Sequence, residues 1–214
     1  MQIEKIVSRG PETADIIFSN GDKFRISKIL IYEKALRKGD DVDEELFGIL
    51  ESLNKKNSIK NRALNLLARR PHAKEELRRK LIQKKFEKDL ISEVLSSIEQ
   101  AGLLNDKEFA ILFYNDKLNR GRESKRKILY DLRKRGVSNS VISEVSEMFP
   151  EDEENLDEIK KLVERKLKSH SLQKKSRLEI RNRLYQFLLS KGYDFDVIKQ
   201  IIDELTGEIN EGDS

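Results

Sequence analysis

The 214-residue sequence predicts a mainly α-helical protein: three tandem three-helix repeats in an elongated array, with a small β-hairpin and helix module at the amino end. Three observations support this prediction. The first thirty residues contain short apolar segments separated by turn residues, whereas the later apolar patterns have a helical period. Six apolar positions recur at matching offsets in three copies. In two copies a glycine follows a basic helix, as at a helix end.

The amino-terminal segment, residues 1–57, is expected to form a small antiparallel sheet followed by helices. Its apolar segments are Ile3, Ile6 and Val7; Ile16, Ile17 and Phe18; and Phe24 and Ile26. Asn20 and Gly21 lie between the second and third segments, and both tolerate the positive φ of a tight hairpin turn. A helix is predicted over residues 28–38, ended by Gly39, and another over residues 43–53, with acidic residues in its first turn.

The repeat divides the rest of the chain into residues 58–104, 105–149 and 150–206, followed by a tail at 207–214. Its six positions are Leu77, Leu81, Phe86, Leu90, Ile91 and Val94; Ile128, Leu132, Val137, Val141, Ile142 and Val145; and Leu184, Leu188, Tyr193, Val197, Ile198 and Ile201. A further helix precedes each set, over residues 60–69, 106–119 and 156–168. Asn105 and Glu108 have the spacing of a capping box at the second of these helices. The acidic run at residues 150–154 is typical of a linker.

The composition argues against catalysis and metal binding. Cys is absent, and neither His72 nor His170 has neighbours arranged like a catalytic triad or a metal site. The ten glycines include no G-x-x-x-x-G-K-[ST] phosphate-binding motif and no G-x-G-x-x-G turn. We therefore expect no enzyme, no catalytic residue, no cofactor and no metal. The longest apolar run, residues 109–114, is far shorter than the roughly 20 residues that span a bilayer, and the first residues lack a secretory signal. These features favour a cytoplasmic protein without membrane contact.

The positive charge is concentrated in the middle of the chain. Residues 54–149 contain 23 basic and 13 acidic residues (net +10), whereas residues 1–53 and 150–214 each have a net charge of −3. Two predicted helices in this region, one containing Leu77 and Leu81 and the other Ile128 and Leu132, combine an apolar stripe with basic flanks. Tyr130 falls among the basic residues of the second helix. Candidate contacts with a partner or with DNA are Arg70, Arg78, Arg79, Arg126, Lys127, Tyr130, Arg133 and Lys134.

These basic helices leave several interpretations open. Charge of this kind can serve solubility alone, and pairs such as Glu75 with Arg79 or Asp116 with Arg120 support a helix surface. Nucleic-acid phosphates and an acidic protein groove are both suitable partners. Reading of DNA bases by a helix-turn-helix is less favoured, because the basic helices contain few Asn, Gln or Ser side chains.

One set of residues resembles the RecX family of regulators of the RecA recombinase. These residues are Ala63, Leu64, Leu67, Arg70, Glu76, Leu77, Leu81, the run from Gly102 to Asp106, Phe109, Ala110, Gly121, Leu132, Gly136 and Val137. The hairpin with Asn20 and Gly21 and the acidic helix entry at residues 40–43 resemble the extension of longer members. Two positions depart from the family pattern: Ala73 replaces a usual Ser, which removes a helix cap, and His72 replaces a frequent Arg.

The resemblance implies a non-enzymatic monomer that binds the RecA nucleoprotein filament. Such a protein would limit filament assembly, and with it the ATPase, strand-exchange and coprotease activities, in recombinational repair and the SOS response. Contact with single- or double-stranded DNA would be weak. A rival hypothesis is a sequence-tolerant DNA-binding protein that acts independently of RecA; steep salt dependence of its DNA affinity would favour it.

Overall fold

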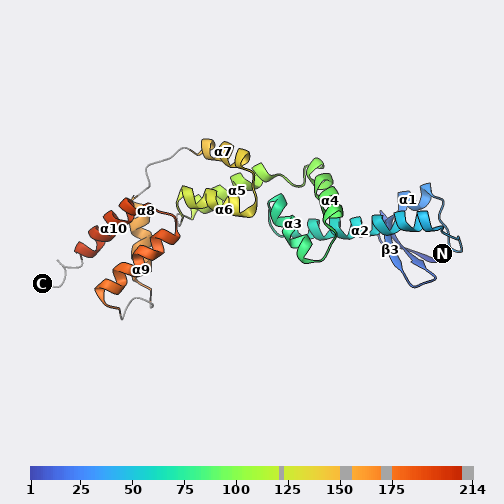
Figure 1. Cartoon of the computed structure of the whole chain (residues 1–214), viewed down its shortest axis with the longest axis horizontal. Coiled ribbons are helices and arrows are strands. Elements are labelled where there is room, and N and C mark those ends of the chain that lie inside the picture. Colours follow the sequence, from blue (N-terminus) through green and yellow to red (C-terminus); the bar gives the residue numbers. More distant parts are fainter. Residues whose placement is uncertain (121–122, 150–155, 170–174, 209–214) are drawn as a thin grey trace. The chain divides into compact units, whose positions relative to one another are not determined.

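The computed structural model describes residues 1–120, 123–149, 156–169 and 175–208 (Figure 1). These residues form mainly helices, with a three-stranded antiparallel sheet at the amino end, which confirms the predicted fold class. The chain divides into two units, Met1–Leu104 and Asn105–Ser214. The elongated arrangement of the repeats stays a prediction. Gly121, the expected linker at 150–154, His170 and the end of the tail at 209–214 lie outside the described residues.

The sheet consists of β1 (Ile3–Ser8), β2 (Thr13–Phe18) and β3 (Lys23–Ser27), paired in that order. The turn between β2 and β3 follows the prediction: Gly21 has a φ of 87°, and the Asn20 side-chain oxygen accepts a hydrogen bond from the Asp22 backbone N–H at 3.0 Å. Alternate side chains of the strands bury one face of the sheet, as the pleat requires. The buried set is Ile3, Ile16, Phe18, Phe24 and Ile26.

Helix α1 (Lys28–Glu33) is shorter than expected, so the predicted helix over residues 28–38 is wrong at its carboxyl end. The chain leaves the helix at Ala35, whose φ is 49°. The following segment pairs with β1 instead: the Gly39 N–H donates to the Ile3 carbonyl at 2.8 Å, and the Ile3 N–H donates to the Asp40 carbonyl at 2.9 Å. Backbone pairing at the edge of the sheet has therefore replaced the last helical turn.

Helix α2 (Glu44–Leu67) replaces the two helices expected over residues 43–53 and 60–69. Its first turn is capped by the Asp43 side chain, which accepts from the Leu46 N–H at 2.8 Å. Leu50 packs into the core under the sheet, and Ile59 belongs to the core of the first repeat. The helix therefore runs without a break through the expected boundary between residues 57 and 58.

The remaining helices follow the predicted three-helix pattern. They are α3 (Lys74–Gln83) and α4 (Lys88–Gln100); α5 (Asp106–Asn119), α6 (Lys125–Arg135) and α7 (Asn139–Met148); and α8 (Leu156–Leu167), α9 (Arg177–Ser190) and α10 (Phe195–Glu208). Four of the six repeated positions are buried in all three copies, whereas the fourth, at Leu90, Val141 and Val197, is half-buried in each. The apolar repeat therefore marks equivalent core positions.

The corner after the second helix has the same left-handed backbone in each copy. Gly136 and Gly192 have φ values of 90° and 85°, as predicted for helix-ending glycines. In the first copy Lys85 occupies this position with a φ of 64°. The left-handed backbone at this corner therefore occurs in every repeat, even in the first, where lysine is an unfavourable residue for a positive φ.

The helix starts differ between copies as the sequence implies. Ser124 caps α6 by accepting from the Lys127 N–H, and Ser176 forms a full capping box at α9. Ala73, at the start of α3, makes no side-chain cap, which confirms the lost cap. The Asn105 side chain caps α5 by accepting from the N–H groups of Lys107 and Glu108.

Candidate partner-binding surface

Tyr130 is exposed on α6, on the side opposite the buried Ile128 and Leu132. The residue is 54% exposed, as predicted. The Lys127 Nζ lies 5.1 Å from the centroid of the Tyr130 ring and 2.7 Å from the Asp131 carboxylate. The ring is thus held beside a cation whose charge is partly balanced, and it offers a rigid amphipathic contact.

Three further basic candidates lie on the exposed part of α6. Arg126 is 80% exposed and forms an ion pair with Asp194 at 2.9 Å. The Arg133 Nε donates to the Asn139 side-chain oxygen at 3.2 Å. Lys134 is also exposed. Exposed pairs of this kind contribute little to stability, so these side chains can exchange their partners at small cost.

The start of α6 contacts the corner of the third repeat, which sequence analysis did not predict. The Ser124 Oγ donates to the Gly192 carbonyl at 2.8 Å, and the Ser124 N–H donates to the Lys191 carbonyl at 3.0 Å. A Cβ at position 192 would lie 2.6 Å from the Lys127 Cβ. Gly192 is thus required both for its positive φ and for this close approach, so the candidate helix has a fixed place on its own unit.

The candidates of the first repeat are paired with acidic residues of the same repeat. Arg70 forms an ion pair with Glu76, and its Nη1 donates to the Pro71 carbonyl at 2.9 Å. Arg78 and Arg79 both pair with Glu75, at 3.2 Å and 3.7 Å. Of the pairs predicted by spacing, Glu75 with Arg79 and Asp116 with Arg120 are both present. Much of the charge on α3 is therefore balanced locally.

The structure gathers the eight candidates into two groups. Arg70, Arg78 and Arg79 belong to the first unit, and the other five lie on α6 in the second unit. On α3, Ile82 follows the buried Leu81 but is itself 37% exposed, so it lies outside the apolar stripe. The pairing of Arg70 with Glu76 has no helical spacing that could have indicated it in the sequence.

His72 is buried near Arg70, as expected for a structural histidine. Its Nε2 lies 2.8 Å from the Lys80 Nζ, which can only donate, so Nε2 accepts and Nδ1 carries the proton donated to the Arg70 carbonyl at 2.8 Å. Burial lowers the pKa of the imidazole below its ordinary value. The described residues contain no group of three or more His, Asp or Glu side chains suited to a metal ion.

Matches to protein-family models cover the three repeats. Residues 60–97 match "RecX, first three-helix domain", residues 105–145 match the second such domain, and residues 152–202 match the third. A regulatory protein RecX of Clostridium botulinum is 31% identical over 201 residues, covering 94% of this chain and 93% of the relative. The chain belongs to the RecX family.

Other RecX proteins are similar over comparable lengths. A regulatory protein RecX of Clostridium perfringens is 28% identical and covers 94% of both chains. A crystal structure of a regulatory protein RecX superposes on 94% of this chain with a TM-score of 0.65 at 19% identity. That of RecX from Lactobacillus salivarius covers 71% of this chain with a TM-score of 0.52 at 26% identity. The family and the fold are therefore established. In the described part of the chain, no helix is long and apolar enough to cross a membrane.

Proposed function

We propose that this RecX-family chain regulates a RecA-type recombinase by binding its nucleoprotein filament and limiting its assembly and activity. The supporting observation is the match of all three repeats to RecX domains, together with relatives named as regulatory proteins. The chain itself would perform no chemistry. It would act as a monomer in the cytoplasm, with weak contact to DNA in addition to the recombinase.

The proposed contact surface on the second unit is the exposed side of α6. Tyr130 supplies area with little rotamer freedom to lose, and Arg133 and Lys134 supply positive charge. The first unit adds the side chains of Arg78 and Arg79 on α3. A protein that binds the assembled filament more tightly than the free recombinase subunits, or less tightly, shifts the assembly equilibrium by that difference in affinity.

An ATPase titration tests this function. The recombinase hydrolyses ATP on single-stranded DNA, and the chain is added before filament assembly in one series and after it in another. We expect inhibition in at least one series. Reversal of charge at Arg126, Lys127, Arg133 and Lys134 should weaken this inhibition while the far-ultraviolet circular dichroism stays unchanged.

A smaller variant keeps the ion pairs of Arg126 and Lys127 in place. Arg126 and Lys127 pair with Asp194 and Asp131, so their reversal also disturbs the chain itself. The triple variant Tyr130→Ala, Arg133→Glu, Lys134→Glu leaves both ion pairs in place and should weaken inhibition to a similar degree.

The matched control reverses charge at two exposed lysines elsewhere in the second unit, Lys161→Glu and Lys199→Glu. It should inhibit like the unmodified chain. Full inhibition by the triple variant would reject α6 as the contact surface. Absence of any effect on the recombinase, combined with tight and salt-steep binding to DNA, would favour the rival DNA-binding function.

A further inference from the structure

One face of α2 carries a stripe of amide side chains that the proposed function does not use. Asn54, Asn57, Asn61 and Asn65 recur three or four residues apart, which places them on one side of the helix. Under the sheet this side packs through Leu50; beyond the sheet it is open to solvent. Asn has a low helix propensity, so four of them on one helix oppose its stability and call for another explanation.

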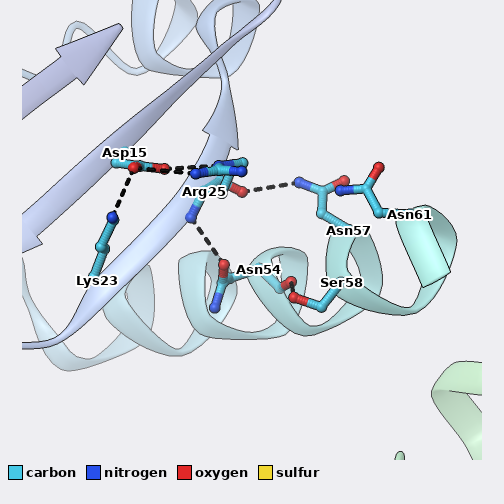
Figure 2. A pocket seen from close by; sticks show the side chains of 7 residues that line it. All are labelled: Asp15, Lys23, Arg25, Asn54, Asn57, Ser58 and Asn61. Atoms are coloured by element: carbon cyan, nitrogen blue, oxygen red, sulfur yellow. Dashed lines mark hydrogen bonds and ion pairs between the residues drawn. The ribbon is translucent and has the colours of Figure 1, made fainter. Parts of the chain in front are cut away.

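The first two amides of the stripe are oriented by the edge of the sheet (Figure 2). The Asn54 Oδ1 accepts from the Arg25 backbone N–H at 2.8 Å, and the Asn57 Nδ2 donates to the Arg25 carbonyl at 3.0 Å. Because a backbone N–H only donates and a carbonyl only accepts, the remaining polar atoms are fixed: Asn54 presents its amide N–H groups and Asn57 presents its oxygen. The stripe thus starts with a donor and an acceptor in set positions.

A shallow polar pocket lies between this part of α2 and β3. Its lining is Asp15, Lys23, Arg25, Asn54, Asn57, Ser58 and Asn61. Asp15 is buried under Arg9, Lys23 and Arg25, and these cations keep the pKa of its carboxyl well below the ordinary value. Three cations meet one carboxylate here, which leaves the pocket with positive charge. The lining contains no aromatic side chain.

The stretch around the stripe contains no acidic residue. Between Glu51 and Glu75 the sequence has seven Lys and Arg residues and no Asp or Glu. Lys60 and Arg62 lie on α2 on opposite flanks of the amides, and in the part of the chain that the structure describes neither side chain has an ion pair. Arg78 and Arg79 on α3 differ from these two residues, because both already pair with Glu75.

We propose that this face of α2 binds double-stranded DNA, with Asn61 and Asn65 on base edges in the major groove and Lys60 and Arg62 on the flanking phosphates. Both amides are exposed and without a hydrogen-bond partner among the described residues, so each keeps a free donor and a free acceptor. An asparagine with both atoms free pairs in a bidentate manner with adenine. The pocket at the sheet edge adds Lys23 as a further cation that can contact the DNA phosphates.

Duplex DNA fits this face better than a single strand does. Proteins that bind single strands without sequence preference stack the bases on aromatic side chains, and neither the stripe nor the pocket supplies one. An acidic protein groove would use the cations but would leave the row of amides unexplained. A helix with amides in the middle and cations on both flanks matches the geometry of a major groove, where base edges lie between two phosphate chains.

The test measures fluorescence anisotropy of a labelled 24-base-pair duplex of mixed sequence, and of its single strand, with the full chain and no recombinase, between 50 and 200 mM salt. The Asn61→Ala, Asn65→Ala variant should lose roughly tenfold or more in duplex affinity without a change in salt slope. The Lys60→Gln, Arg62→Gln variant should lower the salt slope by about 2. Alanine raises helix propensity, so the first variant should fold.

Two comparisons complete the test. The control variant Lys161→Gln, Lys199→Gln, which alters two exposed lysines of the second unit, should bind the duplex like the unmodified chain. Duplexes that contain A·T pairs should be preferred over duplexes of G·C alone, and the alanine variant should lose this preference. Because the recombinase is absent, failure of this proposal leaves the proposed regulatory function untouched.

Several results would overturn the proposal. Unchanged duplex affinity in the alanine variant would show that only charge attracts the DNA. A loss of single-strand affinity with duplex affinity unchanged would assign the face to single strands instead. An equal loss in the control variant, or no binding to duplex at low salt, would reject the site outright.

Discussion

At the scale of single residues, the left-handed corner of the repeats shows how one backbone angle is kept with different side chains. Gly136 adopts its φ of 90° without steric cost, whereas Lys85 holds a φ of 64° against a cost of roughly 1–2 kcal/mol for an L-residue. The equal geometry indicates that packing of the flanking helices sets the corner. The lysine is therefore a position at which the sequence has not reached its most stable choice.

Glycine at position 85 should stabilise the first repeat. We expect Lys85→Gly to raise the free energy of unfolding by roughly 1 kcal/mol, because the relief of strain exceeds the added entropy of the unfolded chain. Gly136→Ala should lower it by about 1–2 kcal/mol. Urea denaturation measures both. Lys84→Gly, one residue earlier at a φ of −85°, is the control and should bring no gain; a gain there would contradict the explanation by backbone angle.

His72 predicts a pH dependence of stability. Its pKa is lower in the folded chain than its ordinary value of 6.5, so the unfolded chain binds the proton more readily. The stabilising contribution is therefore present above pH 6.5 and is lost as the pH falls below it, toward the folded pKa. Urea unfolding of the first unit at intervals between about pH 8 and pH 5 should show this decline. His72→Gln should remove this part of the pH dependence, and an unchanged decline in the variant would assign it to other groups.

At the level of single residues, exposure and ion pairs could be predicted from the sequence where helical spacing carries the information. The exposure of Tyr130 and the pair of Glu75 with Arg79 both follow from positions on a single helix. The pairs of Arg70 with Glu76 and of Arg126 with Asp194 do not, because their partners meet through loops or through another repeat. The sequence alone therefore predicts fewer ion pairs for the basic residues of α3 and α6 than the structure has.

At the scale of elements, α2 shows why two helices were expected where one exists. Residues 54–58, Asn-Lys-Lys-Asn-Ser, have the composition of a loop, and propensity alone predicts a break there. The helix continues because each of its halves packs into a core, through Leu50 under the sheet and through Ile59 in the first repeat, and tertiary packing outweighs propensity. The other repeat helices were placed well, since their apolar period and capping residues agree.

The continuous helix should couple the sheet module to the first repeat. We expect Leu50→Ala and Ile59→Ala each to lower the stability of the same unfolding transition by about 2–5 kcal/mol. Lys56→Pro, which interrupts the helix between these two residues, should cost about 3 kcal/mol or more and split that transition into two. Lys56→Ala is the control, since it removes the ion pair with Glu93 and keeps the helix. A single transition in the proline variant would contradict the coupling.

At the scale of the whole molecule, the two units have separate hydrophobic cores. The first unit contains the core under the sheet and the core of the first repeat, which are joined by α2. The third repeat has its own core, with Leu184, Leu188 and Ile201 at its centre. The chain is expected to unfold in more than one step, because the two coupled cores of the first unit and the core of the third repeat supply separate cooperative transitions.

Calorimetry can assign these steps to the two units. Leu95→Ala removes buried side-chain volume from the first unit and Ile201→Ala from the second, and both positions are fully buried. Each substitution should lower the free energy of unfolding of its own unit by about 2–5 kcal/mol, which lowers the midpoint of one transition by several degrees. The midpoint of the other transition should stay unchanged. Lys199→Ala, exposed on the same helix as Ile201, is the control and should shift neither midpoint appreciably. If Leu95→Ala and Ile201→Ala both lowered one common transition, the two units would form a single cooperative body. The face of α2 proposed to bind duplex DNA could then no longer be treated apart from the face of α6 proposed to bind the recombinase.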